Sequence, residues 1–291
     1  MTKVLSAKPL KTATFQLIDK LLQKDYPIID IGLHSSMNEA GIQLMVAFHG
    51  STKKLESMCG VQRGQKELED MGFFIKSAAL PLLQFETQLE RVNLSHNPTI
   101  AWSLEPLSKL TRLTDLNLSQ CKRLEGTLEP LASLGNLQRL DLSARDTKYG
   151  PEPMSGIKGT LAPLGSCKNL THLNMFGCIA LTGDMDALGE CTNLVYVNLA
   201  HILTIHGTLG PFSKMPKLQV LNLNNSPCIT GDLRPLGGLP ELVDIDFHEC
   251  VELTGSLKCL ETCALLDTVN VLNTGVESGG ADLGNCTVHA M

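Results

Sequence analysis

The chain has 291 residues, of which 43% are hydrophobic and 19% are charged, and its formal net charge is −6. This composition is sufficient for a folded core and disfavours intrinsic disorder. The net negative charge argues against nucleic acid or an anionic membrane as the main partner, because both bind basic surfaces. Only 4% of the residues are aromatic, so we expect an aliphatic core.

The N-terminal sequence contains no apolar run of signal-peptide length, and no stretch approaches the roughly 20 apolar residues of a membrane span. We therefore expect a cytoplasmic or nuclear protein rather than a secreted one. In that setting the ten cysteines are expected to be reduced thiols and not disulfides.

Residues 1–85 lack the regular period that follows them, and we interpret them as a divergent α/β N-terminal cap made of degenerate repeats. Within this part the sequence predicts an amphipathic helix over residues 14–24, a strand over residues 26–31 and a helix over residues 38–48. The alternative for this part is a separate small helical domain.

From residue 86 to residue 275, apolar residues recur with a period of 24. We call the central residue of each repeat its anchor. The anchors are Val92, Leu116, Leu140, Leu173, Val197, Leu221, Ile245 and Val269. The residues three before and two after each anchor are also apolar in every repeat. The one longer spacing, 33 residues from Leu140 to Leu173, indicates a nine-residue insertion within residues 143–156.

The alternation around each anchor predicts one short strand per repeat, with two apolar side chains turned inward. Strands repeated at a constant interval stack into a parallel sheet, because each repeat buries its apolar side chains only against its neighbours. A glycine recurs ten residues after most anchors, and we expect a positive φ or a close backbone contact there. These glycines are Gly126, Gly159, Gly183, Gly207, Gly231 and Gly255.

The period and the segment ITGDLRPLGGLPEL, residues 229–242, resemble the plant-type class of leucine-rich repeat. The longer strand–helix spacing near residues 26–58 is similar to the ribonuclease-inhibitor-like class. The resemblance implies an α/β solenoid, a right-handed superhelix with a parallel β-sheet on its concave face. It also implies a non-enzymatic protein–protein interaction module, such as an intracellular scaffold, adaptor or regulatory subunit. The alternative is a receptor-like domain that senses a small molecule or carbohydrate.

The insertion should leave the solenoid at the rim, next to His172 and Tyr196. Loops on a rigid scaffold often carry recognition, although a neutral length variation is equally compatible with the sequence. Residues 276–291 show no amphipathic cap, and we expect a frayed C-terminal tail. An edge covered by a partner, or a longer natural chain, are the alternatives for this end.

The outward-facing residues of the strands should form the concave face, where we expect a protein partner to bind. Their variety matters, because core packing does not dictate them. Four rings should cluster mid-face, and exposed aromatic residues often anchor interfaces. A scatter of rings without function is the alternative. The candidate partner-binding residues are Arg139, His172, Phe176, Tyr196, His201, Asp244, Asp246 and His248.

Two other concave features have structural interpretations. An asparagine or aspartate follows every anchor, and we interpret this row as a hydrogen-bonded ladder along the sheet. The acidic patch at Asp244, Asp246, His248 and Glu249 is interpreted as a solvated surface that would steer a basic partner, in preference to a metal site.

The sequence contains no phosphate-binding loop, zinc-protease helix or nucleophile elbow, and we predict no catalytic residue, cofactor or metal. Cys259 with Cys263, and Cys286 with His289, have metal-like spacings. However, Cys167, Cys191 and Cys263 share a repeat position with leucines of the core, so we expect buried structural thiols.

Overall fold

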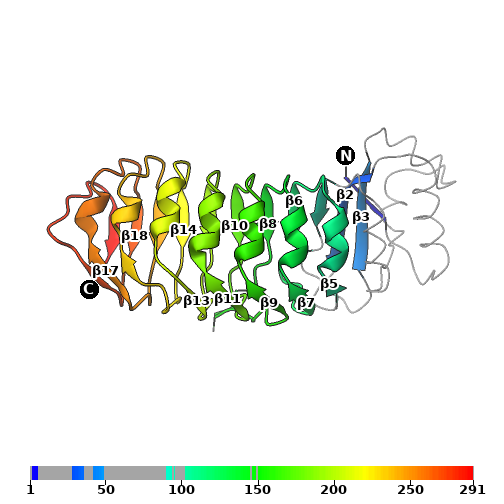
Figure 1. Ribbon diagram of the computed structural model, residues 1–291, viewed down its shortest axis with the longest axis horizontal. Helices are drawn as coiled ribbons and strands as arrows, with labels where there is room; N and C mark the ends of the chain where they lie inside the picture. The colour runs from blue at the N-terminus through cyan, green and yellow to red at the C-terminus, as the bar shows by residue number, and fades with distance from the viewer. Residues whose placement is uncertain are drawn as a thin grey trace.

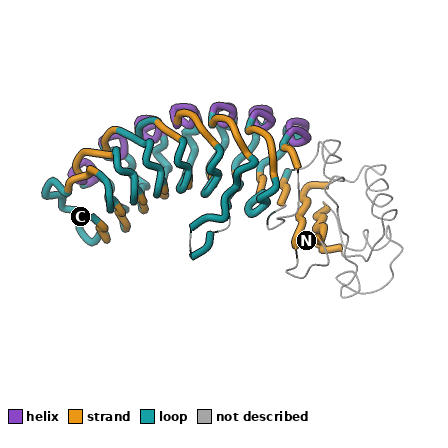
Figure 2. Tube along the Cα trace, turned by 90° about the horizontal axis from the view of Figure 1, so that it is seen from below, coloured by secondary structure: helices purple, strands orange, loops and turns teal. Residues whose placement is uncertain are grey.

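The computed structural model describes residues 2–5, 28–35, 42–48, 90–93, 95, 102–144, 146–148 and 150–290. The repeats form an elongated solenoid with a sheet of twelve strands along its length (Figure 1). Figure 2 shows the solenoid as an arch, with short helices along its outer side. The structure is the predicted α/β solenoid, and the parallel repeat strands stack side by side.

The central eight strands of the large sheet are parallel and three residues long, and each has an anchor at its centre. Their register is constant, so that Leu140 is opposite Leu173 and Leu173 is opposite Val197. Equivalent residues of successive repeats are therefore spatial neighbours. The strands are β4 (Arg91–Asn93), β6 (Asp115–Asn117), β8 (Arg139–Asp141), β10 (His172–Asn174), β12 (Tyr196–Asn198), β14 (Val220–Asn222), β16 (Asp244–Asp246) and β18 (Thr268–Asn270).

A second row of short parallel strands follows the turn of each repeat, and the sequence analysis did not predict it. It divides into two sheets, which are bridged by a pairing of Gly207 with Ile229. The first sheet contains β5 (Trp102–Ser103), β7 (Leu124–Thr127), β9 (Ile157–Thr160), β11 (Leu181–Asp184) and β13 (Ile205–His206). The second contains β15 (Gly231–Asp232), β17 (Leu253–Ser256) and β19 (Gly275–Glu277).

Each repeat then closes with a short 3-10 helix on the outer side. A side chain just before the helix caps its start: Asp184 Oδ1, for example, accepts a hydrogen bond from Asp186 N at 2.8 Å. Such a cap satisfies a backbone N–H that the helix leaves unpaired. The helices are η2 (Glu105–Lys109), η3 (Glu129–Ser133), η4 (Ala162–Ser166), η5 (Met185–Glu190), η6 (Gly210–Lys214), η7 (Arg234–Leu236) and η8 (Leu257–Leu260).

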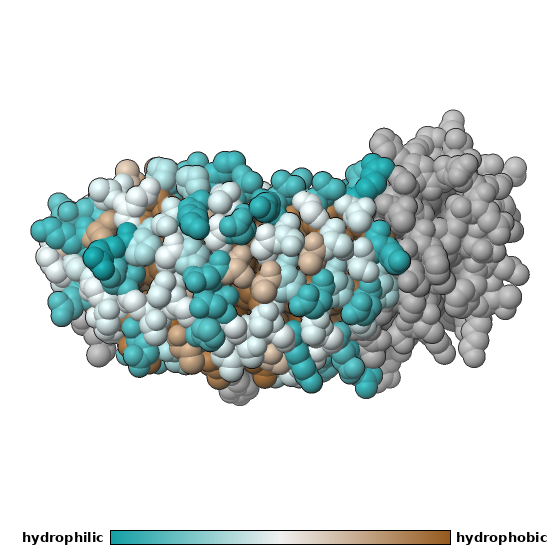
Figure 3. Space-filling model, in the orientation of Figure 1, coloured by the Kyte–Doolittle hydropathy of each residue, from teal (hydrophilic) through white to brown (hydrophobic). Residues whose placement is uncertain are grey.

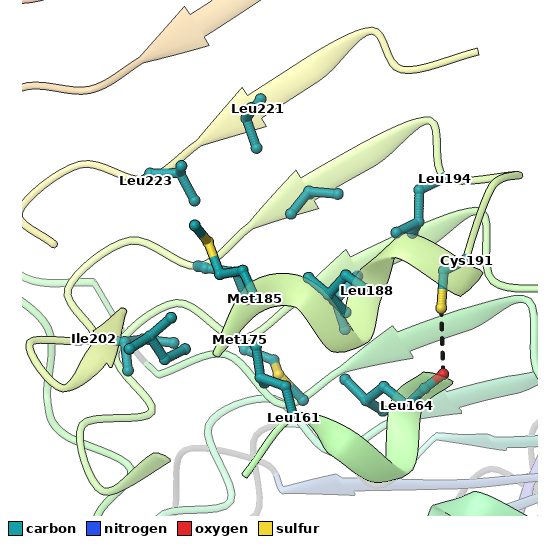
Figure 4. Packing of buried hydrophobic residues seen from close by; sticks show 14 of the residues in the cluster. Leu161, Leu164, Met175, Met185, Leu188, Cys191, Leu194, Ile202, Leu221 and Leu223 are labelled. Atoms are coloured by element: carbon teal, nitrogen blue, oxygen red, sulfur yellow. Dashed lines mark hydrogen bonds between the residues drawn. The ribbon is translucent and has the colours of Figure 1, made fainter. Parts of the chain in front are cut away.

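The core is one continuous aliphatic cluster that runs through all the turns. Figure 4 shows how Met175, Met185 and Leu188 from successive segments pack between the sheet and the helices. Nearly all anchors are fully buried, and each buried Leu, Ile or Val contributes about 1.5–3 kcal/mol. The predicted inward orientation of the anchor residues is confirmed.

The recurring glycines have positive φ angles, as expected, and several of them also touch the preceding turn. Gly255 has a φ of +99°, and a Cβ atom at this residue would lie 2.9 Å from Asp232 Cβ. Both constraints come from the stacking of one turn on the next.

Three described strands belong to the N-terminal part: β1 (Thr2–Leu5), β2 (Ile28–Ser35) and β3 (Ile42–Phe48). The predicted strand over residues 26–31 overlaps β2, and β2 continues the large sheet by parallel pairing with β4. The helix predicted over residues 38–48 is wrong, because β3 pairs antiparallel with both β1 and β2. The alternation of Ile42, Leu44, Val46 and Phe48 suits a strand once those partners exist. The helix predicted over residues 14–24 lies outside the described residues.

The C-terminal segment differs from the frayed tail expected for residues 276–291. Residues 275–277 form β19, which pairs with β17, and β20 (Thr287–His289) pairs parallel with β18. Both sheets thus gain one more strand, although Val288 at the anchor position remains 40% exposed. Backbone hydrogen bonding orders this segment in place of an amphipathic cap. Within the described part of the chain, no helix has the length and hydrophobicity to cross a membrane.

The glycine row gives a first test of the stacking. Replacing Gly255→Ala places a Cβ atom at a φ of +99° and against Asp232, so we expect a loss of about 1–3 kcal/mol, seen as a lower urea midpoint. Gly135→Ala is the matched control, because nothing lies within 4 Å of its added Cβ. Equal midpoints for the two variants would contradict the close approach of the turns.

Candidate functional site

The row of asparagine and aspartate residues after the anchors holds the end of each strand in place. Asn117 Oδ1 accepts a hydrogen bond from Ser119 N at 3.0 Å, and Asp246 Oδ1 accepts one from His248 N at 3.1 Å. The same bond, from the backbone N–H two residues on, occurs in the eight repeats from Asn93 to Asn270. These bonds lie within a repeat, as in an Asx turn, and differ from the ladder along the sheet that we expected. Asp246 thus has a structural role of its own.

Two of the four predicted rings stack on the concave face. His172 on β10 and Tyr196 on β12 are register neighbours, with ring centroids 6.3 Å apart and planes 20° apart. Both side chains are half-buried. The Tyr196 hydroxyl also accepts a hydrogen bond from Asn198 Nδ2 at 3.4 Å, which fixes its position on the sheet.

The other two rings form a separate pair where the strands end. Phe176 and His201 meet edge to face, with centroids 5.2 Å apart and planes 80° apart. His201 lies in a turn with a φ of +59°, and its Nδ1 contacts Asn225 Nδ2 at 2.9 Å. The sequence placed these rings on neighbouring repeats, whereas the structure shows which ring contacts which.

Charged residues adjoin the stacked pair on its N-terminal side. Arg139 Nε on β8 lies 3.6 Å from Asp115 Oδ2 on β6. A concave groove of about 540 Å³ is lined there by residues of β4, β6, β8, β10 and β12, including Arg91, Arg139, His172 and Tyr196. The groove combines cationic and anionic side chains, Asp115 and Asp141 among them, with aromatic surface.

Both histidines of the ring pairs favour the neutral form. Burial lowers the pKa of His172, and Arg139 lowers it further against the opposing effect of Asp115. Burial likewise lowers the pKa of His201, although Asp146 and Asp246 act in the opposite direction. The rings therefore present uncharged surfaces at neutral pH.

The acidic candidates lie two strands further along, on and after β16. Burial raises the pKa of Asp244, and the neighbouring charges of Asp246 and Asp267 raise it further. His248 Nε2 lies 3.5 Å from Glu249 Oε1, and Asp246 Oδ2 accepts a hydrogen bond from Asn224 Nδ2 at 3.1 Å. Among the described residues, no group of three or more His, Cys, Asp or Glu side chains is arranged to hold a metal ion.

The insertion is anchored beside the Phe176–His201 pair. Ala144 N donates to Phe176 O at 2.7 Å, and Met154 N donates to Gly177 O at 3.0 Å. Met154 is fully buried, and Glu152 pairs with Lys122 at 2.7 Å. Figure 2 shows the loop descending from the middle of the arch on its inner side. The loop is therefore tied to the solenoid at both ends.

One surface feature was missed by the sequence analysis. Six residues after four successive anchors stand Ile179, Leu203, Pro227 and Val251, which we call the rim row. Ile179, Leu203 and Val251 are 37%, 48% and 50% exposed. The signal in the sequence was an apolar residue at a repeat position that the core does not use.

The described cysteines are all free, and most of them are buried. Cys191 Sγ lies 3.2 Å from Leu164 O, to which it donates (Figure 4), and burial raises the pKa of Cys191 to about 12. Cys178 and Cys250 donate in the same way to Leu142 O and Leu223 O. These thiols are structural groups of the core and are not reactive.

The chain is similar in fold to several solved structures, while no protein-family model and no curated protein matches it. A plant ice-binding protein aligns with a TM-score of 0.54 at 20% identity, over 67% of this chain and 60% of that one. A TDR receptor aligns with a TM-score of 0.53 at 18% identity, over 72% and 40%. A leucine-rich repeat protein of Leptospira interrogans aligns with a TM-score of 0.50 at 18% identity, over 72% and 57%. The aligned region is less than two thirds of each of those chains, and the likeness is one of fold.

The burial of the thiols is testable by alkylation. In native protein treated with iodoacetamide at about pH 8, exposed Cys228 should react quickly, because the reagent can reach its thiol. Cys191, which is fully buried, should react only after denaturant is added. Peptide mass spectrometry measures both sites in one sample, and equal native rates would contradict the buried placement.

The acidic group gives a pH-dependent prediction. Because the pKa of Asp244 is raised above its ordinary value of 3.8, its ionised form opposes folding at neutral pH. Asp244→Asn should therefore raise the melting temperature at pH 7, and the gain should shrink toward zero as the pH falls to about 4. Glu125→Gln, at an exposed carboxylate, is the control. If the two proteins differed in melting temperature by the same amount at every pH, the raised pKa of Asp244 would be contradicted.

Proposed function

We propose that this chain, which has the leucine-rich repeat fold, is a non-enzymatic module that recognises a partner protein through its concave face. The observation that carries the proposal is the pairing of four partly exposed rings, His172 with Tyr196 and Phe176 with His201, in the middle of that face. Protein interfaces often depend on a few central aromatic anchors of this kind.

The scaffold beneath these rings supports this proposal. The ends of the eight strands from β4 to β18 are fixed by the same Asx-type hydrogen bond, and the anchors of these strands are buried. A surface that is already ordered loses little conformational entropy when a partner binds. The side chains on it are free to vary, because the core does not constrain them.

The charges around the rings suggest how a partner would be oriented. Arg139 and Asp115 stand on the N-terminal side of the stacked rings, whereas Asp244 and Asp246 stand on the C-terminal side. A partner with a basic segment toward β16 would match this polarity. Rim charges of this type mainly affect association rate and orientation.

The thiols support an intracellular setting, such as that of a scaffold, adaptor or regulatory subunit. Nine described cysteines are free, and buried thiols that donate to backbone carbonyls serve the fold in their reduced state. Proteins of oxidising compartments generally pair their cysteines. We propose a cytoplasmic or nuclear location on this ground.

A receptor-like domain that senses a small molecule or carbohydrate is the second candidate. The groove of about 540 Å³ lined by Arg91, Arg139, His172 and Tyr196 has the volume of a small-ligand site and supports it. The groove extends across five strands, so a larger partner would cover more of it. A small ligand would depend on Arg139 and Tyr196 but not on Phe176, which separates the two candidates.

The proposal is tested by replacing Phe176→Ala and Tyr196→Ala together and repeating affinity capture from a lysate with identification of the retained protein. We expect capture to be abolished, because the central contact area of both ring pairs is lost. The melting temperature should fall by no more than a few degrees, since both side chains are only half-buried.

The matched control replaces Thr268→Ala and Leu272→Ala, which occupy the same two repeat positions near the C-terminal end. Capture should survive in this control. Undiminished capture by the Phe176/Tyr196 variant would remove the rings from the interface.

A further inference from the structure

The rim row is an exposed apolar ridge that the core does not require. In the described part of the chain, five large apolar side chains are exposed, and three of them, Ile179, Leu203 and Val251, occupy this one repeat position. Half-buried Pro227 completes the row between Leu203 and Val251. Figure 3 shows hydrophobic side chains along the lower edge of the solenoid, below β11 and β13. Such a concentration on one edge is typical of an interaction surface.

The fold itself tolerates a charged residue at this repeat position. In the repeat of β6 the equivalent residue is Lys122, whose side chain is 47% exposed and pairs with Glu152. The residue directly before each member of the rim row packs into the core instead. These residues are Cys178, Ile202, Ser226 and Cys250, and all four are buried. The apolar identity of the rim row therefore has no explanation in packing.

The backbone below the rim row is held rigidly. Cys178 Sγ, Ser226 Oγ and Cys250 Sγ each donate to a carbonyl oxygen of the preceding repeat, at 3.3, 3.3 and 3.0 Å. Across the same turns, Asn225 Nδ2 contacts His201 Nδ1 at 2.9 Å, and Asn273 Nδ2 donates to Glu249 Oε1 at 2.8 Å. The exposed side chains thus stand on ordered turns, which lowers the entropic cost of binding.

The spacing of the row matches one kind of partner. Parallel strands lie about 4.8 Å apart, so the four residues span about 14 Å along the solenoid. An α-helix rises about 5.4 Å per turn, so three turns of an amphipathic helix laid along the rim place one apolar side chain beside each repeat. A strand laid the same way would present alternate residues about 6.8 Å apart and would lose the match.

The charges beside the row indicate the charge of that partner. At the C-terminal end, Glu249 and Glu252 belong to the same turn as Val251, and the Glu249 side chain is 42% exposed. Exposed Asp146 acts electrostatically on His201, which belongs to the turn of Leu203. Lysine or arginine residues flanking an apolar helical stripe complement these carboxylates. The same carboxylates would repel an anionic membrane surface.

We infer that the rim row from Ile179 to Val251 is a second docking surface, which takes a basic amphipathic helix of a partner protein lying along the solenoid axis. The rim row shares no residue with the concave ring pairs. Each of the two proposed sites can therefore be tested, and refuted, without the other. A partner that engages both would wrap from the concave face over this edge, past the anchored insertion.

The probe is a labelled 18-residue peptide of leucine and lysine whose leucines recur at helical spacing. Its binding is measured by fluorescence anisotropy against a peptide of scrambled order and against a version with glutamate in place of lysine. The full chain should bind the ordered lysine peptide at least ten-fold more tightly than either control. Equal binding of the scrambled peptide would overturn the inference, because it would show attraction by charge alone.

Leu203→Ser and Val251→Ser together should weaken binding of the ordered peptide at least ten-fold without changing the melting temperature. Leu265→Ser, the same change at a 57% exposed leucine outside the row, should leave binding unchanged. Equal losses in both variants would overturn the inference, and so would undiminished binding by the double variant.

The Phe176→Ala and Tyr196→Ala variant separates this site from the proposed concave one. It should keep the affinity of the full chain for the peptide, even where it loses its captured partner. A loss of peptide binding in that variant alone would assign the peptide to the concave face and refute a rim site. Co-sedimentation with phosphatidylcholine vesicles that depends on Leu203 and Val251, without peptide binding, would also refute it and indicate a lipid surface.

Discussion

The structure depends on the in-register stacking of one repeat on the next. A single repeat contributes a strand of three residues and one 3-10 helix, and it cannot enclose its own leucines. Burial comes from the turns on either side, so the anchors reach zero or near-zero exposure only inside the stack. The same register carries the parallel backbone hydrogen bonds from β4 to β18.

Because the register is constant, residues at the same repeat position have the same surroundings in each repeat. Equivalent backbone groups are therefore often satisfied by the same kind of hydrogen bond. The position after the anchor needs an acceptor for a backbone N–H, which either Asn117 or Asp246 supplies. Five positions after the anchor, Cys178, Ser226 and Cys250 each donate to a carbonyl of the preceding turn, whereas apolar Ile202 fills the same position. Asparagine, aspartate and cysteine residues that could be taken for ligand-binding or catalytic groups in the sequence thus form hydrogen bonds with backbone N–H and C=O groups.

At a few repeat positions, neither backbone hydrogen bonding nor core packing determines the side chain. These positions can therefore determine which partner the protein binds. The residue before the anchor carries His172 and Tyr196, and the residues three and four after it carry Phe176 and His201. The residue six after it carries the rim row. The insertion is held through Ala144 N to Phe176 O and Met154 N to Gly177 O, and it breaks the uniformity of the stack at the repeat of β8.

The sequence by itself determined the repeat, the one anchor strand of each repeat, the buried rows, the positive-φ glycines and the buried thiols. These features follow from residues that recur once per turn, so their pattern is visible without coordinates. Tertiary structure decided what depends on neighbours from elsewhere. Residues 42–48 became β3 because β1 and β2 supply pairing partners, whereas the local sequence is compatible with a helix. The asparagines bond within their own turns, and His172 meets Tyr196 while Phe176 meets His201, because side-chain geometry selects among several possible neighbours. The sequence places Leu203 and Val251 at a repeat position outside the core rows, but their exposed fractions of 48% and 50% depend on how the turns stack.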